Sequence, residues 1–362
     1  MAKLATSEFA AGQPDNRTFG RVTNPWDVDR WTGGSSTGSG AALARRLLPL
    51  AIGTDTGGSI RVPSAWCGTT GLKPTFGRVS CAGVLPLSWT LDHVGPMART
   101  ARDCGLLLAA IAGSDPLDPG STAPAVSDRL VTGPWCSGTP TSLAGLRIGA
   151  VGGWFTDVCD GEVLSAWRVA LEVLADAGAV VVPVELPSAH LAFEAGWKIL
   201  MAEAASLHEP HLGRLGELDP GFVARMMPGR EQRTIDYLRA LRIRPVVFSE
   251  AMAAFESLDA LCTIGIPGTA PRFDQLTVEV NDVSHPMQAV HSRATMFGNM
   301  TGLPALMCPS GFDRKNLPTA AQFIGRPFDE ATIIDVGGAF QERTTHHLAS
   351  ALQPVPTERS PS

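Results

Sequence analysis

The chain has 362 residues, of which 44% are hydrophobic and 18% charged, and its formal net charge is −6. These values are typical of a globular protein with one large core, and the negative charge argues against direct binding of nucleic acid through its phosphates. The seven cysteines are an odd number without a CxxC pair, which favours free thiols in a reducing compartment over a disulfide framework.

The N-terminal residues lack the unbroken apolar run of a signal peptide, and no later run of apolar residues is long enough to span a bilayer. We therefore expect a cytoplasmic protein that makes no membrane contact.

The first third of the chain predicts a helix and then a strand. Residues 41–48 are good helix formers after a turn rich in Gly and Ser, so we expect a helix from near Ser39 to just before Pro49. Leu50, Ala51 and Ile52 then predict a short buried strand.

The middle of the chain predicts a βαβ unit. After a long surface connection rich in Pro, Gly, Ser and Thr at residues 116–141, a strand is expected at 146–151 and another buried strand at 179–184. Between them Asp160 is the expected N-cap and Gly178 the expected C-cap of an amphipathic helix. Its apolar face comprises Val163, Trp167, Ala170, Leu171 and Leu174.

Residues 190–258 have a helical pattern with scattered charges, and we interpret them as a variable helical cap. We interpret His208 and His211 there as surface histidines, because no third metal ligand lies at a recognised spacing. Residues 353–362 are Pro-rich and polar, so a disordered tail is expected. We therefore predict a single domain over residues 1–352.

Two glycine turns that carry serines are the most informative feature of the chain. GGSSTGSG begins at Gly33, TDTGGSIR begins at Thr54, and GLKPT follows at residues 71–75. Alone, such a run is more often a flexible linker or a phosphate-binding loop than a catalytic turn. In this order and spacing, the three runs resemble the amidase signature, a family that hydrolyses carboxamides with a Ser-Ser-Lys triad.

Other segments extend the resemblance along the chain. They are KLATSEF at residues 3–9, LDHVGPMART at 91–100, FGNMTGLPALMCPSGF at 297–312 and FIGRPFDEAT at 323–332. The resemblance implies an α/β fold in which helices flank a large mixed β-sheet, with the active site at one end of the sheet and the N-terminus of the domain incomplete.

The resemblance implies a role for each serine. Ser59 would be the nucleophile that forms an acyl-enzyme, and Ser35, on a cis peptide bond, would relay its proton. Amide carbonyls are weak electrophiles, so the developing oxyanion must meet fixed donors. We assign the amides of the Thr56, Gly57, Gly58 and Ser59 turn as that oxyanion hole, because glycine accepts the backbone angles of such a turn.

Ser36, Asp55 and Arg61 are expected to support the site. Asp55 and Arg61 flank the nucleophile and could hold its loop by charge-assisted hydrogen bonds, although a purely structural pair explains them equally well. Cys67 falls within the signature, and we interpret it as an inert packed thiol.

The lysine of the triad has no counterpart in this chain. In the family it lies in a VKD-like motif upstream of the segment that corresponds to residues 3–9, and none of Lys3, Lys73, Lys198 and Lys315 has that position. We expect the 362-residue chain to be impaired, because loss of a base can cost roughly 10⁴- to 10⁶-fold in kcat. We favour a start codon placed too late, and a truncated gene product or an inactive amidase-like binding protein stays open.

The predicted function is hydrolysis of a small-molecule amide to a carboxylic acid and ammonia or an amine, without a metal or organic cofactor. The alternative enzyme is the glutaminase subunit of a complex that transamidates charged tRNA, which shares the same signature. Homo-oligomers are compatible with either function.

Overall fold

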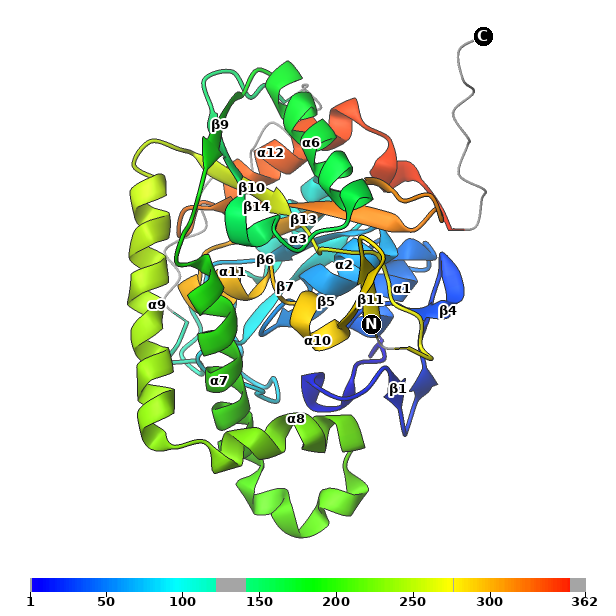
Figure 1. The fold of residues 1–362 in the computed structure, drawn as a ribbon, viewed down its shortest axis with the longest axis vertical. Coiled ribbons are helices and arrows are strands. Elements are labelled where there is room, and N and C mark those ends of the chain that lie inside the picture. The colour runs from blue at the N-terminus through cyan, green and yellow to red at the C-terminus, as the bar shows by residue number, and fades with distance from the viewer. Residues whose placement is uncertain (1, 122–140, 276, 352–362) are drawn as a thin grey trace.

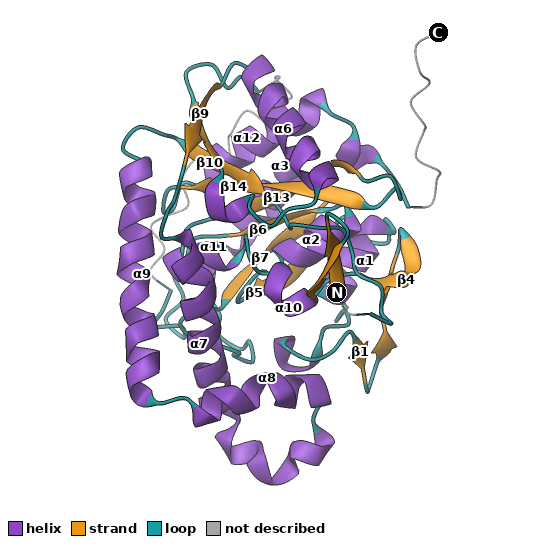
Figure 2. Ribbon diagram, viewed as in Figure 1, coloured by secondary structure: helices purple, strands orange, loops and turns teal. Residues whose placement is uncertain are grey.

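The computed structural model describes residues 2–121, 141–275 and 277–351. In these residues a mixed sheet of eight strands forms the centre of the molecule, with helices on both faces (Figure 1, Figure 2). In spatial order the strands are β5 (Leu50–Asp55), β7 (His93–Ala98), β6 (Thr70–Lys73), β13 (Ala305–Phe312), β14 (Pro318–Gly325), β10 (Ala260–Ile264), β8 (Arg147–Val151) and β9 (Val180–Val184). This architecture confirms the predicted fold class.

Two helical layers cover the sheet. One face carries α3 (Ala101–Ile111), α6 (Gly161–Asp176) and α12 (Glu330–Arg343), and the other carries α1 (Thr37–Ala44) and α2 (Arg61–Cys67). The strands from β5 to β10 pair antiparallel, whereas β10, β8 and β9 run parallel. In the middle of the sheet, β6 from the first part of the chain pairs with β13 from the last part.

The remaining strands and two further short helices lie outside the eight-stranded sheet. They are β1 (Asp15–Asn16), β2 (Gly20–Arg21), β3 (Thr23–Asn24), β4 (Asp27–Trp31), β11 (Thr277–Val280), β12 (Val283–Pro286), α10 (Met287–Val290) and α11 (Met296–Thr301).

Residues 189–254 are almost entirely helical, as the sequence predicts for the cap. The helices are α7 (Ala189–His208), a 3₁₀ segment (Glu209–Glu217), α8 (Pro220–Glu231) and α9 (Thr234–Ala254). They pack against one another and against α11 beside the sheet (Figure 1). In the described residues, no helix combines the length and the apolar composition that a membrane span requires.

The βαβ prediction is confirmed by parallel β8 and β9 with α6 between them. The Asp160 carboxylate accepts the amide hydrogen of Glu162 as the predicted N-cap. The C-cap is Ala177, and the predicted Gly178 follows it with φ = 102°. The predicted burial of residues 179–184 is wrong, since β9 is an edge strand and Val180 is 49% exposed. One side of an edge strand lacks a neighbour that could cover it.

The helix that we predicted from Ser39 to Pro49 begins at Thr37 and ends at Ala44. Arg46 adopts φ = 58°, and the amide of Leu47 bonds back to the carbonyl of Ala42, which closes the helix four residues early. The next strand is present, but Leu50 and Ile52 are exposed on one face of the edge strand β5. The prediction that all three residues of this strand are buried is therefore wrong.

His208 corrects the prediction of surface histidines, whereas His211 is exposed as predicted. The imidazole of His208 is buried between the rings of Phe9 and Phe222, at centroid distances of 4.4 and 4.7 Å. These aromatic rings come from the N-terminal segment and from α8, so no local pattern around His208 reports the burial. The predicted disordered tail and most of the predicted surface connection lie outside the described residues.

Candidate active site

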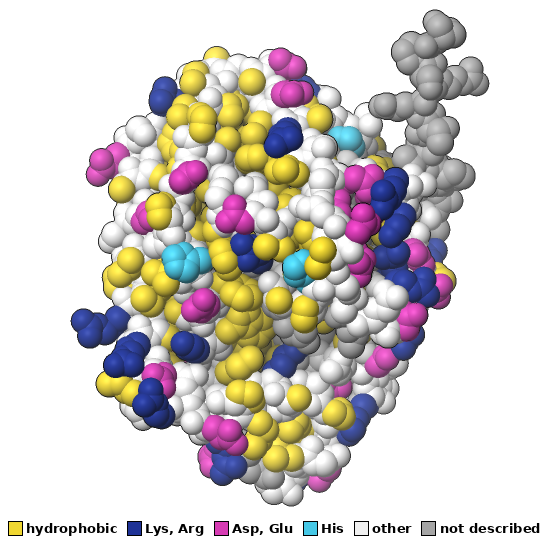
Figure 3. Space-filling view, in the orientation of Figure 1, with side chains coloured by type: hydrophobic (Ala, Val, Ile, Leu, Met, Phe, Trp, Pro, Cys, Tyr) yellow, Lys and Arg dark blue, Asp and Glu magenta, His cyan; other side chains and the backbone are white. Residues whose placement is uncertain are grey.

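Both predicted catalytic serines line one hollow, which we call the serine hollow. Its volume is about 40 Å³. Its walls are Ser7, Ala10, Ala11, Gly12, Trp31, Gly34, Ser35, Thr56, Gly57, Gly58, Ser59, Leu87, Trp197, Leu200, Arg225 and His291. The structure therefore brings together the two serine turns, the N-terminal segment and the helical cap. Figure 3 shows hydrophobic side chains gathered along the middle of the face between α7 and α10.

The first turn approaches the second through its backbone. The peptide bond between Gly34 and Ser35 is cis, as the resemblance implies, and the amide of Ser36 donates to the carbonyl oxygen of Ser59 over 3.2 Å. A Cβ atom at Gly34 would lie 2.6 Å from the Trp31 ring, so only glycine fits there. The Ser36 hydroxyl lies 3.3 Å from both the amide nitrogen and the carbonyl oxygen of Thr54, and so connects the turn to β5.

In the second turn, the peptide unit between Gly57 and Gly58 is held by hydrogen bonds at both its N–H and its carbonyl. The Gly58 amide donates to Asp55 Oδ1 over 2.9 Å, and the Gly57 carbonyl accepts a 2.6 Å hydrogen bond from the Thr295 hydroxyl. Gly58 has φ = 135°, and a Cβ atom there would lie 2.5 Å from Thr295 Oγ1. Within the turn Ser59 and Gly57 are partly exposed to the hollow, whereas Thr56 is buried.

These contacts distinguish Gly58 from the other amides of the predicted oxyanion hole. Its N–H is already used by Asp55, so it cannot also face a substrate oxygen without breaking a buried charge-assisted hydrogen bond. The amides of Thr56, Gly57 and Ser59 donate to no group in the described part of the chain. Three of the four predicted donors are therefore available for an oxyanion.

A fully buried polar network lies behind the turn and begins at Asp55. The Asp55 carboxylate accepts from the amides of Ile60 and Arg61, from Arg61 Nε at 3.0 Å and from Arg61 Nη2 at 2.9 Å. Asn299 Nδ2 adds a 2.9 Å bond to the same carboxylate. The expected charge-assisted hydrogen bonds between Asp55 and Arg61 are present, and they belong to the loop that carries Ser59.

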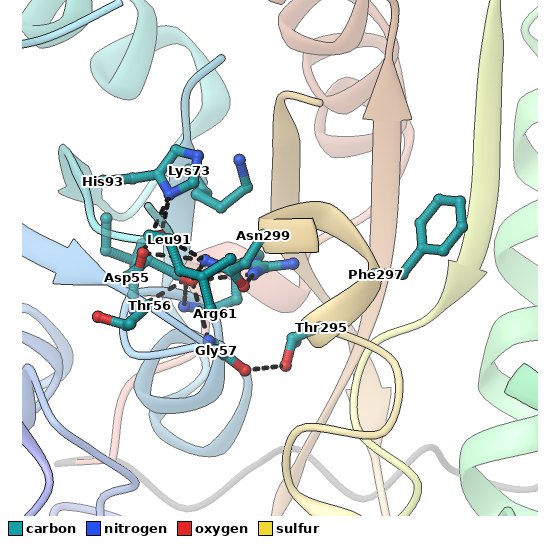
Figure 4. Close-up of polar contacts among 12 residues, drawn as sticks. Asp55, Thr56, Gly57, Arg61, Lys73, Leu91, His93, Thr295, Phe297 and Asn299 are labelled. Carbon is teal, nitrogen blue, oxygen red and sulfur yellow. Dashed lines mark hydrogen bonds and ion pairs between the residues drawn. The ribbon is translucent and has the colours of Figure 1, made fainter. Parts of the chain in front are cut away.

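Arg61 extends the network across the sheet. Its Nη1 donates to Gln322 Oε1 over 2.8 Å, and its Nη2 donates to Asn299 Oδ1 over 2.7 Å. Figure 4 shows Asp55, Arg61 and Asn299 converging at the centre, with Thr295 directed toward Gly57 and Phe297 directed away. Burial raises the pKa of Asp55, but the charge and hydrogen bonds of Arg61 and the bond from Asn299 outweigh it and hold the pKa below its usual range.

Two neighbours of this network are buried and titratable. Lys73 donates from Nζ to the carbonyl of Pro74 over 2.8 Å, and burial together with the Arg61 charge holds its pKa well below the usual range. His93 contacts the carbonyl of Leu91 through Nδ1 at 2.7 Å, and burial lowers its pKa as well. None of the four lysines of the chain, all of them described, lines the serine hollow.

Sequence reasoning missed several residues of the site. Arg225 on α8 donates from Nη1 to the carbonyl of Ala11 at 2.9 Å and is the cationic side chain that lines the serine hollow. Burial and the Arg225 charge lower the pKa of His291 to about 4. No local motif marks these residues or Thr295, whereas Asn299 lies in a segment that the resemblance covers. Cys67 is buried, and burial raises the pKa of its thiol, in agreement with an inert packed residue.

Comparison with known proteins gives a consistent result. A family model described as Amidase matches residues 1–334. A glutamyl-tRNA(Gln) amidotransferase subunit from Chromohalobacter salexigens is 39% identical over 96% of this chain and 74% of its own length. An amidase of Pseudomonas putida is 38% identical over 96% of this chain and 73% of its own length.

A solved structure gives the same relationship in three dimensions. It was reported under the words "An unexpected vestigial protein complex reveals the evolutionary origins of an s-triazine catabolic enzyme". It superposes with a TM-score of 0.86 and 35% identity over 93% of this chain and 72% of that chain.

Proposed function

Because this chain belongs to the amidase family, we propose that it hydrolyses a carboxamide C–N bond through an acyl-enzyme on Ser59. The observation that carries the assignment is that Ser59 and Ser35 line the same hollow, with their turns joined by the hydrogen bond from the Ser36 amide to the Ser59 carbonyl. Ser59 is also partly exposed there, so a substrate carbonyl can reach it.

In the proposed cycle Ser59 Oγ attacks the amide carbon and gives its proton to Ser35 Oγ, while Ser35 passes its own hydroxyl proton to an acceptor beyond it. The amides of Thr56, Gly57 and Ser59 stabilise the oxyanion, and Ser35 returns a proton to the departing amine. Water then hydrolyses the ester on Ser59. The cycle uses neither a metal nor an organic cofactor.

The proton acceptor beyond Ser35 would approach from a second hollow that Ser35 also lines, which we call the edge hollow. Its volume is about 630 Å³, and its walls include Lys3, Leu4, Ser36, Leu50 and Ile52. The family resemblance implies that the acceptor is a lysine amine. We do not assign Lys3 to this role, since it belongs to the segment before the first turn, which has another place in the family pattern.

We propose that this unit covers residues 1–352, works in the cytoplasm on a small-molecule amide and makes no direct contact with nucleic acid. The helices of residues 190–258 would act as its cap, since α7 and α8 contribute Trp197, Leu200 and Arg225 to the serine hollow.

A glutaminase subunit of an amidotransferase is the second candidate function. Arg225 favours it, because a guanidinium in the serine hollow can pair with the carboxylate of an amino-acid amide such as glutamine. Several relatives, including the one from Chromohalobacter salexigens, are named as subunits of a glutamyl-tRNA(Gln) amidotransferase. Ammonia release from glutamine that requires added partner subunits would favour this candidate, whereas turnover of simple amides by the chain alone would favour a stand-alone amidase.

Labelling with a fluorophosphonate probe tests the nucleophile. We expect the wild-type chain to form an adduct at Ser59 and the Ser59→Ala variant to form none. The Ser142→Ala variant is the matched control, because Ser142 is exposed and lies outside both hollows. An adduct that persists in Ser59→Ala would rule out Ser59 as the nucleophile.

A further inference from the structure

A third hollow adjoins the serine hollow, and we call it the apolar hollow. Its volume is about 220 Å³. Six apolar side chains dominate its walls, namely Phe76, Val79, Val84, Leu85, Trp89 and Val94. Ala10, Thr56 and Leu87 line both this hollow and the serine hollow, so the two spaces share a wall at the Thr56 end of the nucleophile turn.

The size of the serine hollow requires such an extension. Its volume of about 40 Å³ is close to that of one or two water molecules and accommodates little more than the reacting amide group. The remainder of a substrate must therefore occupy neighbouring space. The apolar hollow has more than five times this volume, and cavities of about 150 Å³ can already hold an aromatic ring.

The loop that forms the wall of the apolar hollow is held by two carboxylates, of which Glu203 is buried and Asp92 is partly buried. Asp92 accepts hydrogen bonds from the amides of Leu87 and Ser88 and from the Thr56 hydroxyl. Glu203 on α7 accepts from the Ser88 hydroxyl at 2.6 Å and from both the amide and the hydroxyl of Thr90. These bonds fix the loop between the nucleophile turn and the cap, so the wall is formed before a ligand arrives.

The charges around the apolar hollow select against an anionic group. The ionisable side chains among its lining residues are Cys81, Asp92, His93 and Asp118, and none of them is a lysine or an arginine. Asp92 already accepts the bonds described above, and Asp118 accepts one from the amide of Cys81. A neutral apolar group can enter without leaving a buried charge unpaired, whereas a carboxylate would lie beside two acidic side chains.

The position of Ser35 decides which half of the substrate, the acyl half or the amine half, enters the apolar hollow. Ser35 must lie near the departing amine to protonate it, and Ser35 does not line the apolar hollow. The acyl half therefore extends away from Ser35, past Thr56, toward the apolar walls.

We propose that the apolar hollow is the acyl subsite and that it takes a neutral apolar acyl group, such as a six-carbon alkyl chain or a substituted aromatic ring. This inference rests on the proposed function, because it uses Ser59 and Ser35 as the reacting groups. Leu85, Trp89 and Val84 form the partly exposed lip of the subsite, with Leu85 66% exposed.

Steady-state hydrolysis of hexanamide and acetamide tests the proposal. We expect kcat/KM to be at least tenfold higher for hexanamide, because each buried methylene group contributes about fourfold. Leu85→Asp should abolish this preference. Leu47→Asp is the matched control, because Leu47 is also exposed and lies outside both the apolar and the serine hollows, and it should keep the preference.

Turnover of both amides without a preference, or an equal effect of the two Asp variants, would overturn the acyl subsite and leave the proposed function intact. Calorimetric binding of the two amides to the Ser59→Ala chain tests the case in which the subsite exists but the chain does not hydrolyse amides. In this case the wild-type chain hydrolyses neither amide, but Ser59→Ala binds hexanamide at least tenfold more tightly than acetamide. If Leu85→Asp in the Ser59→Ala background removes that difference in binding, the apolar subsite is supported and the proposed hydrolytic function is not. Equal binding of both amides would overturn the subsite.

Discussion

The hydroxyl of Thr295 donates a 2.6 Å hydrogen bond to the carbonyl oxygen of Gly57, across a separation of 238 positions in the chain. The same peptide unit donates its Gly58 amide to Asp55, so its plane is fixed from both sides. The orientation of the Gly57–Gly58 peptide determines where the neighbouring free amides of the turn point. Preorganised hydrogen-bond donors of this kind are a major source of transition-state stabilisation.

We expect Thr295→Val to lower kcat about tenfold with little change in KM, because the side chain keeps its shape but releases the Gly57 carbonyl. Stability should fall by about 1 kcal/mol, the usual net value of one hydrogen bond. Amide hydrolysis kinetics and urea unfolding measure the two effects. Thr301→Val is the control, since Thr301 bonds to the Phe297 carbonyl within α11; an equal loss of kcat in both variants would contradict a role at the turn.

Asp55→Asn is expected to destabilise the folded chain by about 3–5 kcal/mol, because the buried Arg61 guanidinium then lacks its counter-ion. The free energy of unfolding, from urea titration, measures the loss. The exposed pair of Arg214 and Glu217 provides the comparison, and Glu217→Gln should give no measurable change. Equal stability of Asp55→Asn and wild type would show that the network does not hold this loop.

Ser35→Ala is expected to lower kcat by about 10²- to 10⁴-fold while KM changes little, because Ser35 would move protons and bind no part of the ground-state substrate. Ser64→Ala is a suitable control, because the Ser64 hydroxyl donates to the carbonyl of Ile60, the N-cap of α2, and Ser64 is buried as Ser35 is. A parallel rise of KM in Ser35→Ala would indicate that Ser35 binds substrate instead of relaying protons.

The stability of the fold should depend on pH through His291. Burial and the Arg225 charge lower its pKa from 6.5 to about 4, so between these values the unfolded chain binds a proton that the folded chain does not. The contribution of neutral His291 to the free energy of unfolding is fully present above pH 6.5. It decreases by up to about 3 kcal/mol as the pH falls toward 4.

His291→Asn removes the titrating group and retains a donor for the Met287 carbonyl. Urea unfolding at pH 7 and pH 4.5 should therefore show a pH-dependent loss that is about 2 kcal/mol smaller in the variant than in the wild type. The same loss in both proteins would mean that His291 is protonated equally in the folded and unfolded states.

Several features of the fold follow from local sequence alone. The Asp160 cap and the apolar stripe of the following helix predict α6, and the β-branched runs beside it predict β8 and β9. These signals work because backbone hydrogen bonds and helix periodicity involve residues that are close in sequence. Burial was less predictable: Leu50 and Ile52 lie on an edge strand, and only the order of the strands in the sheet decides that.

The features of the candidate site also fall into those that local sequence predicts and those that require the tertiary structure. The sequence by itself determined the family, the two serine turns and the glycines that permit them, because turn conformation depends on residue type within a few positions. Only the tertiary structure decided that the Gly58 amide is occupied by Asp55, that Thr295 holds Gly57, and that Arg225 and His291 line the hollow of Ser59. For Thr295, Arg225 and His291 the physical reason is that the contact is supplied through space by segments more than one hundred positions away, and no local pattern encodes which segment arrives there. Asp55 lies close to Gly58 in sequence, and its carboxylate accepts from that amide because the folded turn brings the two groups together.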